Sequence, residues 1–318
     1  MSAQEILRFL RDPLDFADDP VDADIWDAGF SDVAQPLTEA ANIPLRRAQI
    51  DAWHGLAHAR AGLILGPPGT GKTHALAWMA AGYLEARRRA GLPCRILVSA
   101  FTRNAIINLI EAIAVRCQQL DVPPRIAFVG REPSSPLAPG VEHLDVDDAA
   151  ALLTEDYAVA GMTVWGLNRL IDAQGGFTGA FFHLTCVDEA SQMVLSHGLM
   201  AIAGMAENGR ILVAGDNKQL PPIRVEHEHD VDGRRLGSSL YAFLQAAGVP
   251  EFPFDETFRL NEPLTRFPRD RFYENRYQSV VPERCLPLIE DWEQGLDDWE
   301  RVALDPEYPI CVLIHDGP

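Results

Sequence analysis

The chain has 318 residues, of which 47% are hydrophobic and 23% charged, so it is long enough to bury a sizeable core in one large or two ordinary domains. Its formal net charge of −19 argues against a surface that coats nucleic acid generally, although a local basic groove remains compatible with it. The sequence contains no run of about 18 apolar residues, so it predicts no membrane span. The acidic N-terminus excludes a secretory signal. The five cysteines are widely spaced, which fits a reducing cytoplasm rather than a disulfide or zinc scaffold.

Residues 1–44 form the most acidic part of the chain. They hold ten acidic residues and two arginines, and they contain only short apolar stretches at 6–10 and 25–30. This composition predicts a weakly ordered acidic extension with at most one short helix. Such an extension could serve as a solubilising tail, or it could bind a partner or cover a groove.

From residue 45 onward the pattern changes to strands that alternate with helices. The strands are apolar along almost their whole length, which is typical of a parallel sheet covered by helices on both faces, so we predict an α/β fold. Residues 133–160 are rich in proline and then acidic, and we expect an irregular insertion there. We expect helices at 45–61, 73–89 and 105–119, and strands at 62–65, 95–100, 125–130, 162–165, 183–188 and 210–214.

A proline-containing seam near residue 250 divides this pattern from the rest of the chain. Beyond it we expect a helical stretch up to Tyr277 and a strong strand at 308–315. A strand so close to the last residue looks like the beginning of another sheet. The expected domains are therefore an acidic extension at 1–44, a main α/β domain at 45–250 and an incomplete second domain at 251–318.

The strongest chemical signal is a glycine-rich loop between an expected strand and an expected helix. The pattern G-x-x-x-x-G-K-[ST] lets backbone N–H groups close around phosphate oxygens, and the helix N-terminus adds partial positive charge. Lys72 would reach the β- and γ-phosphates, and the Thr73 hydroxyl would bind Mg²⁺. The residues of the loop are Gly66, Pro67, Pro68, Gly69, Thr70, Gly71, Lys72 and Thr73.

Two further polar clusters follow expected strands. Asp188 and Glu189 come at the end of 183–188, where Asp188 would hold Mg²⁺ through water and Glu189 would orient and deprotonate the attacking water. Gln219 lies in the segment GDNKQLPP after 210–214, and its amide has the donor and acceptor ends that a γ-phosphate sensor needs. The same segment could equally be a solvated turn built by Gly, Asp, Asn and Pro.

The ordered set GPPGTGKT, VDEASQM and GDNKQLPP resembles the first motor domain of the superfamily 1 helicases. It is most similar to the 5′-to-3′ branch that includes the nonsense-decay and Okazaki-processing enzymes, and the resemblance covers about residues 45–318. It implies a RecA-like P-loop NTPase fold, the cofactors ATP and Mg²⁺, and movement along single-stranded DNA or RNA.

The resemblance also assigns residues outside those three motifs. Gln49 matches the glutamine that reads the adenine edge, although it could be an ordinary surface residue of a helix. Thr102 and Arg103 follow the second strand where the family touches the nucleic-acid backbone, and their side chains suit phosphate contact. Thr163 and Trp165 belong to a second strand-binding motif. Trp165 could stack on a base or be a buried core residue.

Past the seam, the segment ETFRL resembles the opening motif of the second motor domain. The resemblance places Phe258 on the adenine ring and Arg259 near the γ-phosphate, where an arginine would neutralise charge that builds up during phosphoryl transfer. Ordinary packing and a surface ion pair are the alternative roles for these two residues.

Three functions remain open from the sequence. The first is an ATP-dependent helicase or translocase that is present as an incomplete motor, either a fragment or one half of an enzyme that a second chain completes. The second is a non-catalytic nucleotide- or partner-binding module that keeps the helicase fold. The third is a stand-alone P-loop ATPase that acts on proteins.

Overall fold

The computed structural model describes residues 3–19, 21–120, 123–176, 181–222, 230–231, 234–235, 237–284 and 295–305. Contacts divide the chain into two compact units, each of which is described by itself. The first unit comprises residues 1–66 and 72–254, and the second comprises 67–71 and 255–318. The expected strand at 308–315 lies outside the described residues. None of the described helices is both long enough and apolar enough to cross a bilayer.

The first unit is an α/β domain, as the sequence predicts. Its strands are β1 Ala61–Leu65, β2 Cys94–Ala100, β3 Arg125–Val129, β4 Glu142–Leu144, β5 Tyr157–Met162, β6 Phe182–Asp188, β7 Met205–Gly215, β8 Asp230–Val231, β9 Arg234–Arg235 and β10 Glu251–Pro253. Its helices are α1 Ala3–Arg11, α2 Pro13–Ala17, α3 Ala23–Ala28, the π-helix η1 Gly29–Ala34, α4 Gln35–Ala40, α5 Arg47–Ala57, α6 Lys72–Arg89, α7 Arg103–Cys117, the 3₁₀-helix η2 Val146–Thr154, α8 Val164–Ala173, α9 Leu195–Ala203 and α10 Leu240–Ala246.

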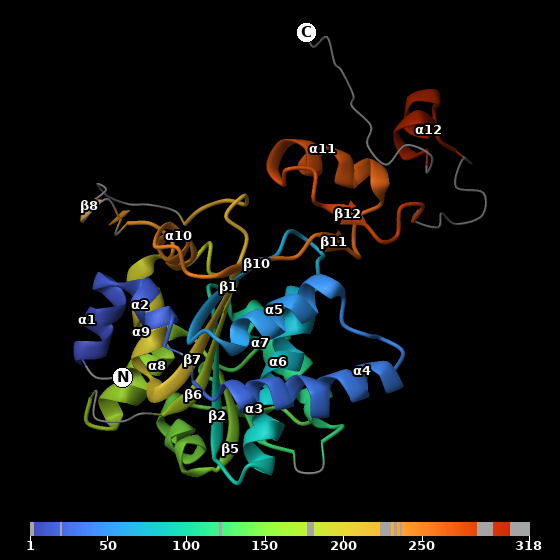
Figure 1. Cartoon of the computed structure of the whole chain (residues 1–318). Helices are drawn as coiled ribbons and strands as arrows, with labels where there is room; N and C mark the ends of the chain where they lie inside the picture. The colour runs from blue at the N-terminus through green and yellow to red at the C-terminus, as the bar shows by residue number, and fades with distance from the viewer. Residues whose placement is uncertain are drawn as a thin grey trace. The chain divides into compact units, whose positions relative to one another are not determined.

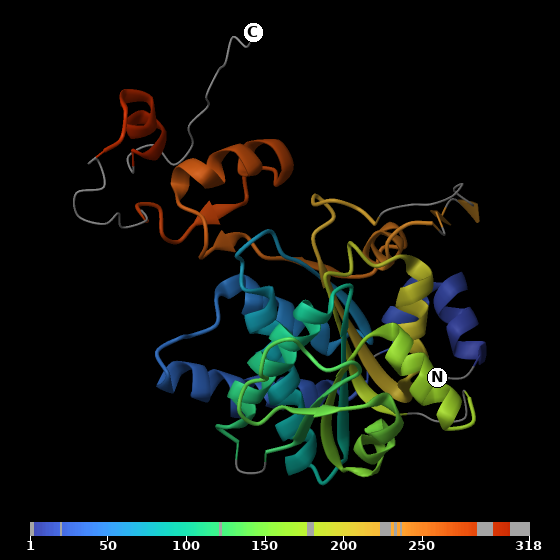
Figure 2. The ribbon, with the colours of Figure 1, turned by 180° about the vertical axis from the view of Figure 1, so that it is seen from behind.

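Eight of these strands form one sheet in the order β10-β1-β7-β6-β2-β5-β3-β4, and every neighbouring pair in it is parallel. Helices α3, α5, α6 and α7 cover one face, while α1, α2, α8, α9 and α10 cover the other (Figures 1 and 2). A parallel sheet that is buried on both faces explains why its strands read as nearly continuous apolar runs. The predicted fold class is therefore confirmed.

The acidic N-terminal segment is not the weakly ordered extension that its composition predicts. It forms α1 to α4 with η1, and its aromatic side chains enter both cores of the first unit. Phe9 and Phe16 are fully buried on one side of the sheet, and Trp26 is fully buried on the other. Net charge misled the prediction because the few apolar residues are spaced so that each helix turns them inward while its carboxylates face solvent.

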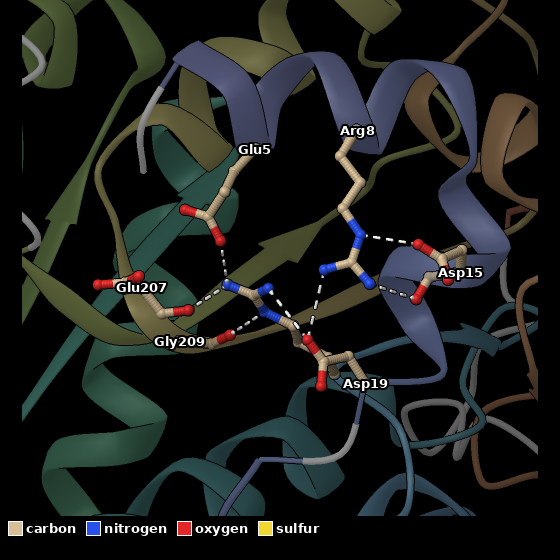
Figure 3. Close-up of polar contacts among 7 residues, drawn as sticks. Glu5, Arg8, Asp15, Asp19, Glu207 and Gly209 are labelled. Carbon is tan, nitrogen blue, oxygen red and sulfur yellow. Dashed lines mark hydrogen bonds and ion pairs between the residues drawn. The ribbon is translucent and has the colours of Figure 1, made fainter.

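A buried arginine attaches the first two helices to the sheet. The guanidinium group of Arg60 donates to Glu5 at 3.2 Å and to the carbonyl oxygens of Glu207 and Gly209, the last at 3.1 Å (Figure 3). Its carbon lies 4.3 Å from the centre of the Phe16 ring. The exposed Arg8 pairs with Asp15 at 2.7 Å in the same region (Figure 3). Strand β7 and helices α1 and α2 are thus joined by charged hydrogen bonds.

A second buried arginine joins α3 and the end of α5 to the same strand. Arg210 is fully buried, and its guanidinium group donates to the carbonyl oxygens of Leu56, Ala57, Ala59 and Val21. Helix α5 ends at Ala57, so Arg210 satisfies carbonyl groups that have no partner within the helix.

Two sequence-based assignments are wrong at the level of single elements. The expected irregular insertion at 133–160 contains β4, η2 and the first residues of β5, which begins at Tyr157. The expected strand at 162–165 is displaced, because β5 ends at Met162 and α8 begins at Val164. Thr163 caps that helix by accepting a hydrogen bond from the Gly166 amide. The seam near residue 250 contains an edge strand, β10, which pairs with β1.

In the described part of the second unit, the elements are β11 Glu256–Thr257, α11 Glu262–Phe272, β12 Gln278–Ser279 and α12 Asp298–Leu304. Strands β11 and β12 pair in parallel, and Asn261 caps α11 by accepting a hydrogen bond from the Leu264 amide. The five residues Pro67–Gly71 of the glycine-rich loop belong to this unit by their contacts.

Candidate nucleotide site

The sheet of the first unit brings the strand ends from which the three chemical motifs start to one edge. The parallel register pairs Leu65 with Gly215 and Val187 with Val213, so the loops after β1, β6 and β7 begin side by side. The amide of Gly66 donates to the carbonyl oxygen of Gly215 at 3.0 Å. Carboxyl ends of parallel strands are where open α/β sheets bind ligands.

Helix α6 begins at Lys72, the lysine of the glycine-rich loop. The loop turns into the helix through Gly69 and Gly71, which have φ angles of 77° and 80°, a conformation that glycine adopts without strain. The Lys72 ammonium group donates to the carbonyl oxygen of Gly66 at 2.5 Å. Lys72 therefore folds back over the beginning of its own loop, which is where a phosphate-binding lysine is expected.

Thr73 and Asp188 lie together at this edge. The Thr73 hydroxyl donates to Oδ2 of Asp188 at 3.4 Å, and the backbone amide of Glu189 donates to Oδ1 at 2.8 Å. Asp188 is 4% exposed, and this burial raises its pKa to about 6, although Lys72 opposes the shift. A hydroxyl and a buried carboxylate are hard oxygen donors of the kind that Mg²⁺ prefers, and a cation would offset the cost of burying the carboxylate charge. The residues therefore fit a magnesium ion.

Glu189 has an unusual backbone. Its φ angle is 51°, which is uncommon for any residue other than glycine and costs about 1–3 kcal/mol. Its half-buried carboxylate accepts a hydrogen bond from the side-chain Nε2 of Gln192 at 3.3 Å. Strain of this kind persists only where the surrounding structure fixes it, and it is concentrated at functional sites.

The Gln219 loop is anchored by a buried aspartate. Asp216 is fully buried, and it accepts hydrogen bonds from the Lys218 amide at 3.0 Å and from Nε2 of Gln219 at 2.8 Å. The structure thus gives the loop a defined conformation rather than that of a freely solvated turn. Gln219 itself remains exposed on the loop that starts beside Gly66.

Gln49 is not a surface residue. It is 4% exposed in the first turn of α5, and its side-chain oxygen accepts a hydrogen bond from the Arg46 amide at 3.0 Å in a capping box. The alternative of an exposed helix position is therefore wrong, and its expected contact with adenine stays a prediction.

The expected nucleic-acid residues lie at the ends of β2 and β5. Thr102 and Thr163 are the N-caps of α7 and α8. The Arg103 guanidinium group donates to the carbonyl oxygens of Arg131 and Glu132, the latter at 3.3 Å. Trp165 is 61% exposed and touches His197 edge-on, with ring centres 5.2 Å apart, so the alternative of a buried core tryptophan is wrong.

In the second unit, Phe258 and Arg259 lie against the glycine-rich loop. The Phe258 amide donates to the carbonyl oxygen of Gly69 at 2.9 Å, and the Phe258 side chain is 36% exposed. A Cβ atom on Gly69 would come within 2.5 Å of Cβ of Arg259. This part of the second unit therefore packs directly on the backbone of residues 67–71.

Sequence reasoning missed the residues that support these motifs. Thr257 and Tyr277 both donate to the carbonyl oxygen of Pro68, and Ser191 accepts a hydrogen bond from the Asp216 amide at 3.3 Å. Thr257 stands within the segment ETFRL, so its position beside two assigned residues was a usable signal. Tyr277 lies 209 residues from Pro68, and nothing in its sequence context indicates the contact.

Comparison with known proteins gives consistent matches. A family model described as "AAA domain" matches residues 49–224. The DNA replication ATP-dependent helicase/nuclease DNA2 of Mus musculus is 22% identical over 278 residues, which cover 80% of this chain and 24% of that protein. The regulator of nonsense transcripts 1 homolog of Drosophila melanogaster is 24% identical over 314 residues, which cover 88% of this chain and 25% of that protein.

Among solved structures, arterivirus nonstructural protein 10, a helicase in complex with DNA, is 14% identical with a TM-score of 0.38. The match covers 70% of this chain and 42% of that chain. The present chain spans about a quarter of the length of the two curated relatives.

Proposed function

The chain belongs to the AAA-domain family and carries a superfamily 1 helicase motor region, and from this premise we propose that it couples Mg²⁺-dependent ATP hydrolysis to movement on single-stranded DNA or RNA. We further propose that the chain belongs to the 5′-to-3′ branch of these helicases and that a second chain or segment completes the motor. The observation that carries it is the 3.4 Å contact between Thr73 and Asp188, beside Lys72 and Glu189.

The proposed chemistry uses side chains that lie at this edge of the sheet. Lys72 would leave the Gly66 carbonyl and neutralise phosphate charge, while loop N–H groups cradle the phosphate oxygens. Thr73 and Asp188 would hold the magnesium ion, which supplies further neutralisation of the triphosphate when it is bound.

Glu189 would accept the proton of the attacking water, because a carboxylate next to the metal-holding aspartate is placed to reach a water at the γ-phosphate. Gln219 would respond to the presence of that phosphate, Gln49 and Phe258 would contact the adenine, and Arg259 would neutralise charge that develops during transfer. Thr102, Arg103, Thr163 and Trp165 would contact the nucleic acid.

The test is ATP hydrolysis measured with and without single-stranded DNA and RNA, for the wild type, Lys72→Ala and Glu189→Gln. We expect strand-stimulated turnover in the wild type and its loss in both variants, with nucleotide binding lost only in Lys72→Ala. Turnover that strands do not stimulate would favour an ATPase that acts on proteins. Nucleotide binding without turnover, even when a complementary motor segment is supplied, would favour a non-catalytic module.

A further inference from the structure

Two hydroxyl groups of the second unit bind one carbonyl oxygen of the glycine-rich loop. The Thr257 hydroxyl donates to the carbonyl oxygen of Pro68 at 3.0 Å, and the Tyr277 hydroxyl donates to the same atom at 2.5 Å. The next carbonyl, that of Gly69, accepts a hydrogen bond from the Phe258 amide at 2.9 Å. Consecutive carbonyl groups of the loop are therefore held by residues that lie about 190–210 positions later in the chain.

These contacts are buried and closely packed. Thr257 is fully buried and Tyr277 is 1% exposed. On folding, their hydroxyl groups therefore replace hydrogen bonds to water with hydrogen bonds to the loop carbonyl. A Cβ atom on Gly69 would come within 2.7 Å of the Thr257 hydroxyl oxygen as well as close to Arg259. Within this unit, Gly69 and residues 257–259 thus lie at a distance that only glycine permits, and the loop cannot turn there without breaking the contacts.

The orientation of this peptide bears directly on phosphate binding. In a planar trans peptide the C=O group and the following N–H group point in opposite directions. When Thr257 and Tyr277 hold the Pro68 carbonyl, the N–H group of Gly69 must point away from them. A glycine-rich loop binds phosphate through its backbone N–H groups. Holding the Pro68 carbonyl in place therefore also fixes the direction of the Gly69 N–H group that would bind phosphate.

We propose that Thr257 and Tyr277 are positioning residues for the phosphate-binding loop, and that they make the affinity for a triphosphate depend on the second motor segment. This inference rests on the proposed function, because it assumes that the loop binds nucleotide phosphates. Phosphate binding at the loop and the placement of residues 255–284 are then coupled, since each stabilises the same peptide orientation.

A purely structural role for the two hydroxyls predicts a different result. It would leave nucleotide affinity unchanged while lowering the stability of residues 255–284. Tyr277→Phe removes a single hydroxyl and keeps the ring, so it is the main test. Thr257→Val removes the second hydroxyl at nearly constant volume, and Thr257→Ser keeps it. Tyr241→Phe is the matched control, because Tyr241 is also a fully buried tyrosine but donates its hydroxyl to Glu251, at 2.6 Å, instead of to a carbonyl of the loop.

The experiment measures the Kd of a non-hydrolysable ATP analogue with Mg²⁺ and the hydrogen–deuterium exchange of residues 66–73 in the nucleotide-free full chain. We expect Tyr277→Phe and Thr257→Val each to weaken binding about 5–10-fold and to speed exchange of the loop. Thr257→Ser and Tyr241→Phe should bind as the wild type does.

Unchanged affinity and unchanged loop exchange in Tyr277→Phe would overturn the inference. If that variant fails to fold, the comparison of Thr257→Val with Thr257→Ser decides in the same way. A wild-type chain that binds no nucleotide would contradict the proposed function itself, and loop exchange would still show whether the hydroxyls position the loop.

Discussion

The hydroxyl of Thr73 meets the carboxylate of Asp188 at 3.4 Å, although the two residues are 115 positions apart. Thr73 lies in the first turn of α6 and Asp188 is the last residue of β6. They come together because helix start and strand end lie at the same edge of the parallel sheet. The buried carboxylate carries a raised pKa, so its negative charge lacks full compensation in the absence of a cation. This pair is the part of the proposed nucleotide site that can be tested most directly.

We predict that Asp188→Asn removes the magnesium dependence of nucleotide binding, because an amide oxygen is a weaker ligand and supplies no charge. The measurement is the Kd of ADP with excess Mg²⁺ and with EDTA, and we expect the ratio of the two constants to fall at least about 10-fold in the variant. Thr73→Ser keeps the hydroxyl and should behave as the wild type does, whereas Thr73→Val should resemble Asp188→Asn. Equal magnesium dependence in all four proteins would contradict the site.

Stability should fall in mild acid because two half-buried histidines are held in the neutral form in the folded chain. Burial and the nearby Arg116 lower the pKa of His74 to about 4, and burial with Arg87 and Arg95 lowers that of His183 to about 4. The unfolded chain takes up protons near pH 6.5 and the folded chain does not, so the stabilisation is present above pH 6.5 and is lost as the pH falls towards 4. After discounting for partial exposure, each histidine should contribute on the order of 1–2 kcal/mol.

The measurement is the free energy of unfolding in urea at pH 5 and pH 7. Asp188 acts in the opposite sense, because its raised pKa makes protonation favour the folded state over the same range. The wild-type difference therefore contains both effects, and the informative comparison is with His74→Gln. This variant should lose part of the pH dependence, whereas His54→Gln, at a half-exposed position, should keep it. Identical pH dependence in the two variants would rule out His74 as a cause of the lower stability in acid.

The N-terminal helices should depend on Arg60 far more than on Arg8. The Arg60 side chain is 2% exposed and binds Glu5 and β7, whereas that of Arg8 is 39% exposed (Figure 3). Arg60→Met should cost about 3–5 kcal/mol of unfolding free energy, because the half-buried Glu5 carboxylate and the carbonyl of the buried Gly209 lose this donor. Arg8→Met should cost at most about 1 kcal/mol. Chemical unfolding of both variants gives the numbers. Similar losses in the two would mean that the cluster does not attach α1 and α2 to the sheet.

The sheet and its three motifs were predictable because they depend on local patterns. Apolar strands, a glycine-rich loop and a helix after it are each encoded within about ten residues, and parallel topology then brings Asp188 to the loop without further information. The acidic segment was not predictable in the same way. Phe16 stands alone among aspartates and Trp26 lies in a short apolar stretch. Both contact partners far along the chain, Arg60 for Phe16 and Arg210 for Trp26.

The same distinction applies to Trp165. Its neighbours Val164 and Leu167 are apolar, so sequence alone favours a strand and leaves the ring's environment undecided. The Thr163 cap starts a helix, which turns Val164 and Leu167 into the core and leaves Trp165 at the surface. A local helix cap, not the strand propensity of the apolar residues, therefore decided both the element and the exposure.

Trp165 is exposed in the first turn of α8, just after β5 ends, and it should stack on a base of a bound single strand. We predict that Trp165→Ala weakens binding of a fluorescein-labelled oligonucleotide by about 1–3 kcal/mol, measured by anisotropy, while the free energy of unfolding changes by less than about 0.5 kcal/mol. Trp165→Phe keeps an aromatic face and should retain most of the affinity. Trp299→Ala is the matched control, because Trp299 is a similarly exposed tryptophan, at 56%, and lies on α12 of the second unit, outside the motifs assigned to nucleic acid. An equal loss in Trp165→Ala and Trp299→Ala would exclude specific stacking at Trp165.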